Sequence, residues 1–200
     1  MSAEPAYPAD GVYHAVYQGV RGSFSEEAAR RMLGRLGQDA RLLGVPSLEA
    51  VRCALQTGLA RRAVVPTHNS IAGDVPGADA IIGLTGARVE AELALPIVQC
   101  LVAPPGTTLA SVRRVISHPM ALAQCHRFLD SRPWLRAEPH DDTAGALQML
   151  MQSTSVAGSS AAAIAGERAA AVWGGVVLQR GIQDTEDNCT TFVLIHRSRY

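Results

Sequence analysis

The sequence predicts an α/β protein with mostly parallel sheets that are covered by helices. Short apolar segments alternate with longer ones in which apolar residues recur every three or four positions, the patterns of strands and amphipathic helices. One short segment, residues 63–65, is wholly apolar, as is typical of a strand covered on both faces. Polar turns follow several of these segments, and ligands of α/β proteins bind beyond such strand ends.

The first half of the chain is predicted to alternate strands with helices. We expect strands at residues 13–18, 41–45 and 63–65. Ser23 and Glu26 have the spacing of a capping box at the start of one helix, and Ser47 begins a second. A β-rich run at residues 90–102 is broken by Pro96. We expect the chain to leave one lobe there and to enter another.

The second half continues the alternation. Strands are expected at residues 112–117, 161–165 and 193–195. Two helices are expected to begin at Pro119 and Asp142, and a third, residues 167–173, to end at Gly174. Residues 176–179 then lead back toward the first lobe.

The composition favours a globular protein with a small-molecule partner. Eighteen basic residues balance eighteen acidic ones, so no basic field indicates nucleic acid, and 48% hydrophobic content is ample for a core. No apolar run approaches the ~20 residues of a membrane-spanning helix. Residues 1–10 resemble neither a signal peptide nor a membrane anchor, and we expect them to be a loosely ordered lead.

The cysteines indicate neither a metal site nor a disulfide framework. Cys53, Cys100, Cys125 and Cys189 are far apart, and none forms a CxxC motif or has a histidine at ligand spacing. Free, buried thiols in a reducing cytoplasm fit this pattern.

Five polar turns share one design. Four of them are expected where a strand passes into a helix, and the fifth precedes the last strand: residues 22–25, 68–70, 117–119, 142–143 and 187–192. Helix N-termini present free N–H groups, so a cleft lined by these turns would suit an anion, most naturally a carboxylate.

The same turns belong to five ordered motifs. They are GVRGSFSEEAA at residues 19–29, VPTHNSIAGDV at 65–75, SHPMALAQC at 117–125, TA at 143–144 and NCTTF at 188–192. In order and spacing they resemble the prephenate dehydratase family, from about Tyr17 to Ile195. Five ordered motifs are far more specific than any one of them.

This resemblance implies a two-lobed fold like that of the type 2 periplasmic binding proteins, with the active site in the cleft between the lobes. Lobe 1 would comprise residues 1–97 and 180–200, and lobe 2 residues 98–179. In the family a regulatory ACT domain follows the last motif, whereas this sequence stops at Tyr200. We therefore expect the catalytic domain alone.

The resemblance also implies a lyase that converts prephenate to phenylpyruvate with loss of carbon dioxide and water, in phenylalanine or related aromatic biosynthesis. Aromatisation drives this reaction, so orientation and a proton donor are needed rather than a metal or a cofactor. Thr190 matches the threonine held essential in the family and would position the leaving hydroxyl. The residues expected to bind substrate are Ser23, Phe24, Asn69, Ser70, Ser117, Gln124, Thr143, Asn188, Thr191 and Phe192.

Three positions depart from the family motifs. Thr191 stands where the family has an arginine, so a guanidinium partner for a substrate carboxylate is missing there. His68 replaces a glutamate and Met120 a glutamine. A protonated His68 in the cleft would partly restore the lost cation and make catalysis sensitive between about pH 5 and 8. The alternative is an exposed cap residue. We expect His118 to cap a helix.

Other functions remain open at this point. The chain could act on arogenate, could be a non-aromatising prephenate decarboxylase, as the missing arginine suggests, or could bind a ligand without catalysis. We expect a cytoplasmic homodimer, as is common in the family, with no nucleic-acid or membrane partner.

Overall fold

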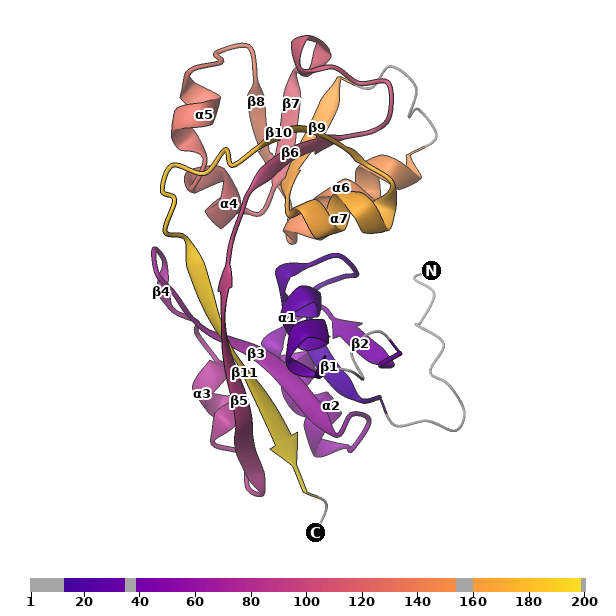
Figure 1. Ribbon diagram of the computed structural model, residues 1–200, viewed down its shortest axis with the longest axis vertical. Coiled ribbons are helices and arrows are strands. Elements are labelled where there is room, and N and C mark those ends of the chain that lie inside the picture. Colours follow the sequence, from indigo (N-terminus) through magenta and orange to yellow (C-terminus); the bar gives the residue numbers. More distant parts are fainter. Residues whose placement is uncertain (1–12, 35–38, 154–159, 199–200) are drawn as a thin grey trace.

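The computed structural model describes residues 13–34, 39–153 and 160–198, so the predicted lead at residues 1–10 lies outside it. Two sheets with their helices lie one above the other along the long axis, and we call each of them a lobe (Figure 1). The chain passes from the first lobe to the second after β5 and returns before β11. The predicted two-lobed α/β fold is confirmed.

The first lobe contains a sheet of order β2-β1-β3-β11-β5, with β4 beside β3. Its strands are β1 (Ala15–Gln18), β2 (Leu42–Val45), β3 (Arg62–Asn69), β4 (Gly73–Asp74), β5 (Ala87–Pro96) and β11 (Cys189–Arg197). Helix α1 (Phe24–Met32) packs on one face through Ala28 and Ala29. Helices α2 (Leu48–Gln56) and α3 (Ala78–Ile82) cover the other face.

The second lobe contains a sheet of order β10-β6-β9-β7-β8. Its strands are β6 (Cys100–Ala103), β7 (Arg114–Ser117), β8 (Arg136–Pro139), β9 (Ala161–Ala165) and β10 (Val176–Arg180), and the short η2 (Leu109–Ser111) precedes β7. Helices α6 (Thr143–Gln152) and α7 (Glu167–Trp173) cover one face. Helices α4 (Pro119–Ala123) and α5 (His126–Asp130) cover the other.

Both sheets are mixed. Three neighbouring strands in each are parallel, whereas β11 is antiparallel to β3 and β5, and β6 is antiparallel to β9 and β10. The strand that runs the other way is in each case the one that arrives from the other lobe. Each of these strands enters its sheet at the end nearer the other lobe and runs away from that lobe. It is therefore antiparallel to its neighbours, whose carboxyl ends point toward the groove between the lobes.

Some local elements differ from the sequence prediction. The turn expected at residues 66–70 is mostly strand, because β3 continues to Asn69 and pairs with the start of β11; β4 follows it, not a helix. The helix expected after Pro119 is interrupted at Gln124 and becomes α4 and α5. Helix α3 and strand β8 were not anticipated.

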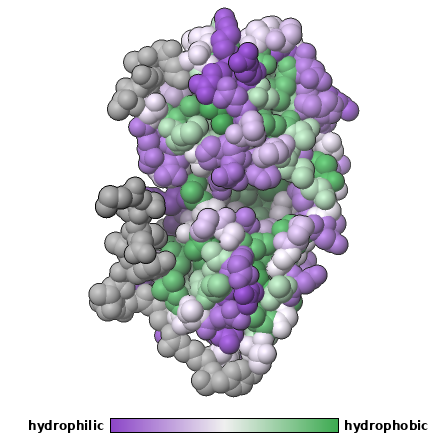
Figure 2. Space-filling view, turned by 180° about the vertical axis from the view of Figure 1, so that it is seen from behind, coloured by the Kyte–Doolittle hydropathy of each residue, from purple (hydrophilic) through white to green (hydrophobic). Residues whose placement is uncertain are grey.

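The predicted helix starts are confirmed. Ser23 Oγ accepts from the N–H of Glu26 at 3.3 Å, and Ser47 and Asp142 cap α2 and α6 in the same way. The Glu26 carboxylate accepts from Gly22 N–H at 2.6 Å instead of closing the capping box on Ser23. These three caps define where the loops end and where helices α1, α2 and α6 begin. Seen from behind, the molecule is hollowed between the lobes, with apolar side chains inside the hollow (Figure 2).

Candidate active site

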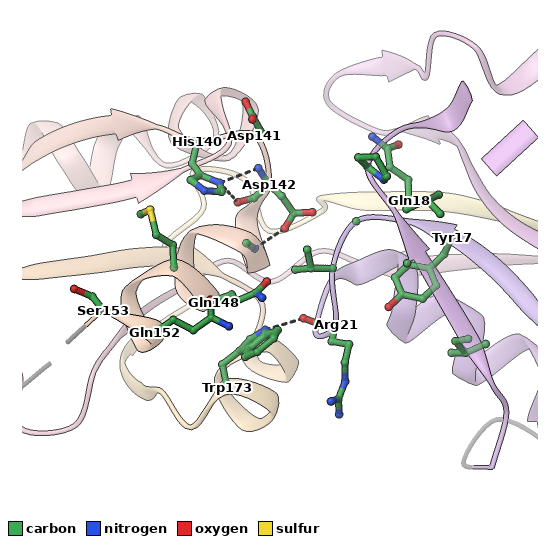
Figure 3. Close-up of a pocket in the computed structure, with 18 residues that line it drawn as sticks. Tyr17, Gln18, Arg21, His140, Asp141, Asp142, Gln148, Gln152, Ser153 and Trp173 are labelled. Carbon is green, nitrogen blue, oxygen red and sulfur yellow. Dashed lines mark hydrogen bonds between the residues drawn. The ribbon is translucent and has the colours of Figure 1, made fainter. Parts of the chain in front are cut away.

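Several cavities lie between the lobes, and two of them are large. The threonine cavity, about 620 Å³, is lined by Phe24, Pro66, Asn69, Ala72, Gly73, Asp74, Val75, Pro76, Ile97, Gln99, His118, Met120, Ala121, Gln124, Thr143, Thr190 and Phe192. The tryptophan cavity, about 940 Å³, is lined by side chains around Trp173 and Tyr17 (Figure 3). A small cavity of about 180 Å³ shares Thr143 with the first and Asp142 with the second.

The threonine cavity gathers half of the residues that the sequence singled out. Thr190, Phe24, Asn69, Gln124, Thr143 and Phe192 all line it. They come from all five motifs, on both lobes, and the fold brings them to one place. This convergence makes the threonine cavity the candidate active site.

A β-bulge decides which side chain of β3 faces this cavity. In the ladder between β3 and β11, Asn69 is opposite Thr190, and Thr67 is an unpaired extra residue. Side chains alternate along a strand, so an unbroken ladder would have placed His68 opposite Thr190. Thr67 Oγ1 donates to the Thr191 carbonyl at 3.2 Å and secures the bulge. The bulge thus brings an amide, not an imidazole, next to Thr190.

Asn69 is the centre of a hydrogen-bond network. Its Nδ2 donates to Thr190 Oγ1 and to Asn188 Oδ1, both at 2.9 Å. Its Oδ1 accepts from the backbone N–H groups of Ile71 at 3.1 Å and Ala72 at 2.9 Å. Two backbone donors require an acceptor oxygen, so they define which way the amide points. Asn69 is therefore held as a donor toward Thr190.

The network reaches the second lobe through Gln124. Asn188, which is buried on the return crossing, donates from Nδ2 to Gln124 Oε1 at 2.9 Å. Gln124 Nε2 lies 3.5 Å from Asn69 Oδ1. Three amides, one from each lobe and one from the crossing, thus form a closed triangle behind Thr190.

The hydroxyl of Thr190 is placed to donate a proton. Because Oγ1 accepts from Asn69, its own O–H is directed elsewhere, and among the described residues it has no acceptor. Thr190 is 9% exposed and lines the cavity. A hydroxyl oxygen of a bound ligand is a suitable acceptor for this proton.

The wall around Thr190 is largely apolar. Phe24, Pro66, Ile97 and Phe192 line the cavity from the first lobe and from the outgoing crossing. Phe192 is 2% exposed and also packs in the core beneath α1. This wall fits a carbocyclic ring better than an extended polar ligand.

The sequence reasoning missed one polar residue of the cavity. Gln99 lies on the outgoing crossing, is 3% exposed and lines the cavity. Its carbonyl Oε1 is buried and has no hydrogen-bond partner in the described part of the chain. Its position three residues after Pro96, at the start of the predicted second lobe, was the one signal that could have indicated it.

Six predicted residues do not line the threonine cavity: His68, Ser70, Ser117, Asn188, Thr191 and Ser23. Of these, Ser23 lines the small cavity. Ser117 Oγ is fully buried and donates to the Ile164 carbonyl at 2.6 Å, and Ser70 Oγ donates to the Asp187 carbonyl at 2.9 Å. Both hydroxyls thus bind backbone rather than face the groove.

The structure agrees with the alternative in which His68 is an exposed residue. Its side chain is 52% exposed, and its Nδ1 lies 2.8 Å from Asp74 Oδ1. Asp74 itself lines the cavity, so His68 lies behind its rim. As expected, His118 caps α4, because its Nδ1 accepts from Met120 N–H at 3.1 Å.

The threonine cavity contains little positive charge. All basic residues of the chain other than histidine are arginines, and none of those in the described segments lines it. Asp74 is its one acidic side chain and His118 its one imidazole. Among the described lining residues, no guanidinium stands in for the arginine that the family has at the position of Thr191.

A buried ion pair joins the two lobes near the small cavity. Glu26 on α1 lies 2.7 Å from Arg30 and 3.5 Å from Arg168 on α7. Burial raises the pKa of the Glu26 carboxyl, but the Gly22 N–H and the two guanidinium groups more than offset this, so its pKa stays below its usual value. Glu26 is thus a charged anchor between the lobes.

The tryptophan cavity has a different construction. Figure 3 shows Tyr17 and Gln18 on one side and His140, Gln148 and Trp173 on the other. Trp173 Nε1 donates to the Arg21 carbonyl at 2.8 Å across the groove. Its lining includes Gly19, Val20 and Arg21 of the first motif, but none of the residues that we expected to bind substrate or to act in catalysis. We do not regard it as the active site, although it is larger.

Two further findings concern residues 13–34, 39–153 and 160–198. No cluster of three or more His, Cys, Asp or Glu side chains is arranged to hold a metal ion. No helix there is long and apolar enough to cross a membrane.

The comparison with known proteins agrees with the motifs. Residues 15–200 match the family model for prephenate dehydratase. The chain is 35% identical over 189 residues to arogenate dehydratase/prephenate dehydratase 2 of Arabidopsis thaliana, covering 90% of this chain and 45% of that protein. It is 36% identical to arogenate dehydratase 2 of Petunia hybrida, covering 90% and 44%. The chain thus spans about half the length of these relatives.

Solved structures of similar fold include two close in shape. A prephenate dehydratase from Arthrobacter aurescens, in complex with L-Phe, is 30% identical with a TM-score of 0.79, over 93% of this chain and 60% of that one. A protein described as a novel type of quorum-quenching acylase is 28% identical with a TM-score of 0.79, over 93% and 64%. The family match covers nearly the whole chain, and the chain belongs to the prephenate dehydratase family.

Proposed function

We propose that this chain is a dehydratase that removes carbon dioxide and water from prephenate or from its amino counterpart arogenate. The observation that carries the proposal is the hydrogen bond from Asn69 Nδ2 to Thr190 Oγ1 at 2.9 Å, which leaves the threonine proton for the departing ring hydroxyl. With prephenate the products would be phenylpyruvate, carbon dioxide and water. One proton is consumed per turnover, because a dianion becomes a monoanion.

The roles of the cavity residues follow from this assignment. The apolar wall of Phe24, Ile97 and Phe192 would hold the diene ring and keep water from it. The ring carboxylate leaves as carbon dioxide, and its bonding electrons move into the ring as the C4 hydroxyl departs. Thr190 would orient that hydroxyl and protonate it, with Asn69 stabilising the oxygen left behind.

Arogenate is the second candidate substrate. Two observations favour it: the threonine cavity has no arginine among its described lining residues, and the names of the curated relatives include arogenate dehydratase. Arogenate carries one net negative charge less than prephenate, so its binding needs less positive charge from a site without a guanidinium.

The test is an incubation of the purified chain with each compound at neutral pH, with the products separated by chromatography and mass spectrometry. Phenylpyruvate or phenylalanine above the enzyme-free control is the expected result. A decarboxylated product that keeps its hydroxyl would replace the proposal with a non-aromatising decarboxylase. Unchanged substrate together with a raised melting temperature would indicate a binding protein. The similarity to an acylase makes amide hydrolysis a useful counter-assay.

Three expectations from the sequence belong to the same proposal. We propose lobe boundaries at residues 97/98 and 179/180, a homodimer and a cytoplasmic location. Size-exclusion chromatography with light scattering tests the dimer, and a mass near 21.1 kDa would exclude it.

A further inference from the structure

The outgoing crossing presents alternate side chains to different sides of the groove. Ile97 and Gln99 line the threonine cavity, whereas Val98 lines a separate cavity of about 390 Å³. This alternation is that of an extended segment. The crossing therefore directs the Gln99 side chain toward the same space as Thr190.

The backbone of Gln99 is held on both sides. Its N–H donates to Gln183 Oε1 at 3.0 Å, and its carbonyl accepts from Ile182 N–H at 3.0 Å. Both partners lie on the return crossing. The position of Gln99 relative to the cavity is thus set by the two crossings together, without the use of its own side chain.

The side chain itself is not satisfied. Gln99 Oε1 is buried and lacks a donor within the described part of the chain, although buried polar atoms are nearly always hydrogen-bonded. Leaving a buried acceptor unpaired costs stability, and a donor on a bound ligand would recover that cost. The last side-chain torsion of glutamine is soft, so the direction of Oε1 can adjust to a bound ligand.

The distance along the crossing fits the far end of the substrate. Thr190 is paired with Leu95, four residues before Gln99, which corresponds to no more than about 13 Å at ~3.3 Å per residue. Two side chains reaching inward from these positions would bracket a six-membered ring with a three-carbon arm. With the ring hydroxyl at Thr190, the opposite ring carbon, which carries the ring carboxylate and the arm, would lie toward Gln99, and of these two groups we assign the arm to it.

We propose that Gln99 determines substrate choice, by accepting a hydrogen bond from an ammonium group on the substrate arm, so that the amino-acid substrate is preferred over the keto acid. This rests on the proposed function. A keto oxygen brings no hydrogen-bond donor: it could accept from Gln99 Nε2 but would leave Oε1 unpaired, whereas an ammonium group would satisfy Oε1. The absence of arginine from the described cavity wall acts in the same direction, because the keto acid carries the larger negative charge.

The test compares kcat/KM for arogenate and prephenate in the wild-type chain and in Gln99→Leu. The wild type should prefer arogenate. Gln99→Leu should lower kcat/KM for arogenate about tenfold or more and change that for prephenate less than about threefold. A wild-type preference for prephenate, or an equal loss for both compounds, would overturn the proposal and leave the dehydratase assignment intact.

Two more variants complete the experiment. Gln148→Leu makes the same chemical change in the tryptophan cavity and should leave the ratio unchanged. If Gln99→Leu does not fold by circular dichroism, Gln99→Glu decides, because a carboxylate should raise the preference for arogenate about tenfold. A ratio that stays the same or falls with Gln99→Glu contradicts the proposal.

Calorimetric titration distinguishes a failure of the Gln99 proposal from a failure of the dehydratase proposal. If the wild type turns over neither compound but binds arogenate, and Gln99→Leu weakens that binding tenfold while prephenate binding is unaffected, the role of Gln99 stands and the dehydratase proposal fails. If neither compound binds, both proposals are wrong.

Discussion

The two interlobe cavities differ in how their polar groups are used. In the threonine cavity an amide triangle satisfies almost every polar atom around one hydroxyl, and that hydroxyl keeps its proton free. In the tryptophan cavity Trp173 bonds to the Arg21 carbonyl across the groove, and His140 and Asp142 make their hydrogen bonds within the loop and first turn of α6 (Figure 3). Volume alone would favour the tryptophan cavity, whereas a preorganised network, on which reactivity depends, favours the threonine cavity.

Replacing Thr190 should reveal the largest difference in catalytic effect between the two cavities. Thr190→Ala removes the positioned proton and should lower kcat/KM about 100-fold or more, as loss of a general acid does. Steady-state kinetics with either substrate measures this, with Gln148→Leu as a control expected to stay within about twofold. If the two variants lost similar activity, the distinction between the cavities would be wrong.

The ion pair between Glu26 and Arg168 links the two lobes outside both cavities. Glu26→Gln leaves Arg168 without its buried partner and should lower the free energy of unfolding by about 2 kcal/mol or more at neutral pH. Urea denaturation monitored by circular dichroism measures it. Arg31→Gln, at the exposed pair with Glu27, is the matched control and should cost less than about 1 kcal/mol.

The contribution of Glu26 to the free energy of unfolding should depend on pH in a defined direction. The folded-state pKa of Glu26 lies below its unfolded value, so its contribution is complete above about pH 4.5 and is lost as pH falls through the folded pKa. The difference between the wild type and Glu26→Gln should therefore shrink as the pH is lowered below about 4. A difference that grew in acid would contradict this assignment.

The orientation of Asn69 can be tested by a change of one atom. Asn69→Asp replaces the donor that faces Thr190 by an acceptor, which would draw the threonine proton toward itself and away from the substrate. We expect kcat to fall about tenfold, with a smaller effect on KM. Unchanged kcat would mean that the amide does not direct the hydroxyl.

The smallest effect is expected in the tryptophan cavity. Trp173→Phe removes only the hydrogen bond to the Arg21 carbonyl and should lower the free energy of unfolding by about 1 kcal/mol. Turnover at the other cavity should stay within about twofold. A loss of activity out of proportion to stability would give this cavity a role in catalysis.

The sequence predicted what depends on neighbours along the chain. The caps at Ser23, Ser47 and Asp142 need contacts only three residues away, and the helices begin where these residues indicated. The convergence of Asn69, Gln124 and Thr190 followed from the motifs and the resemblance.

What depends on strand pairing could not be predicted. The bulge at Thr67 exists only in the ladder with β11, and without it alternation cannot tell whether His68 or Asn69 faces the cavity. The place of Gln99 likewise depends on two crossings that meet through the fold, Gln99 on one and Ile182 on the other. Neither feature has a local pattern in the sequence.

The position of β11 in the sheet has a consequence for how the chain folds. This strand lies between β3 and β5, yet it follows the whole second lobe in the sequence, and its pair Thr190–Asn69 is 121 positions apart. During synthesis the second lobe can therefore complete its sheet first. The edges of β3 and β5 that pair with β11 remain unpaired until that strand has been made. Closing so long a loop is slow, so the first lobe, including Thr190, is expected to be the last part to reach its native form.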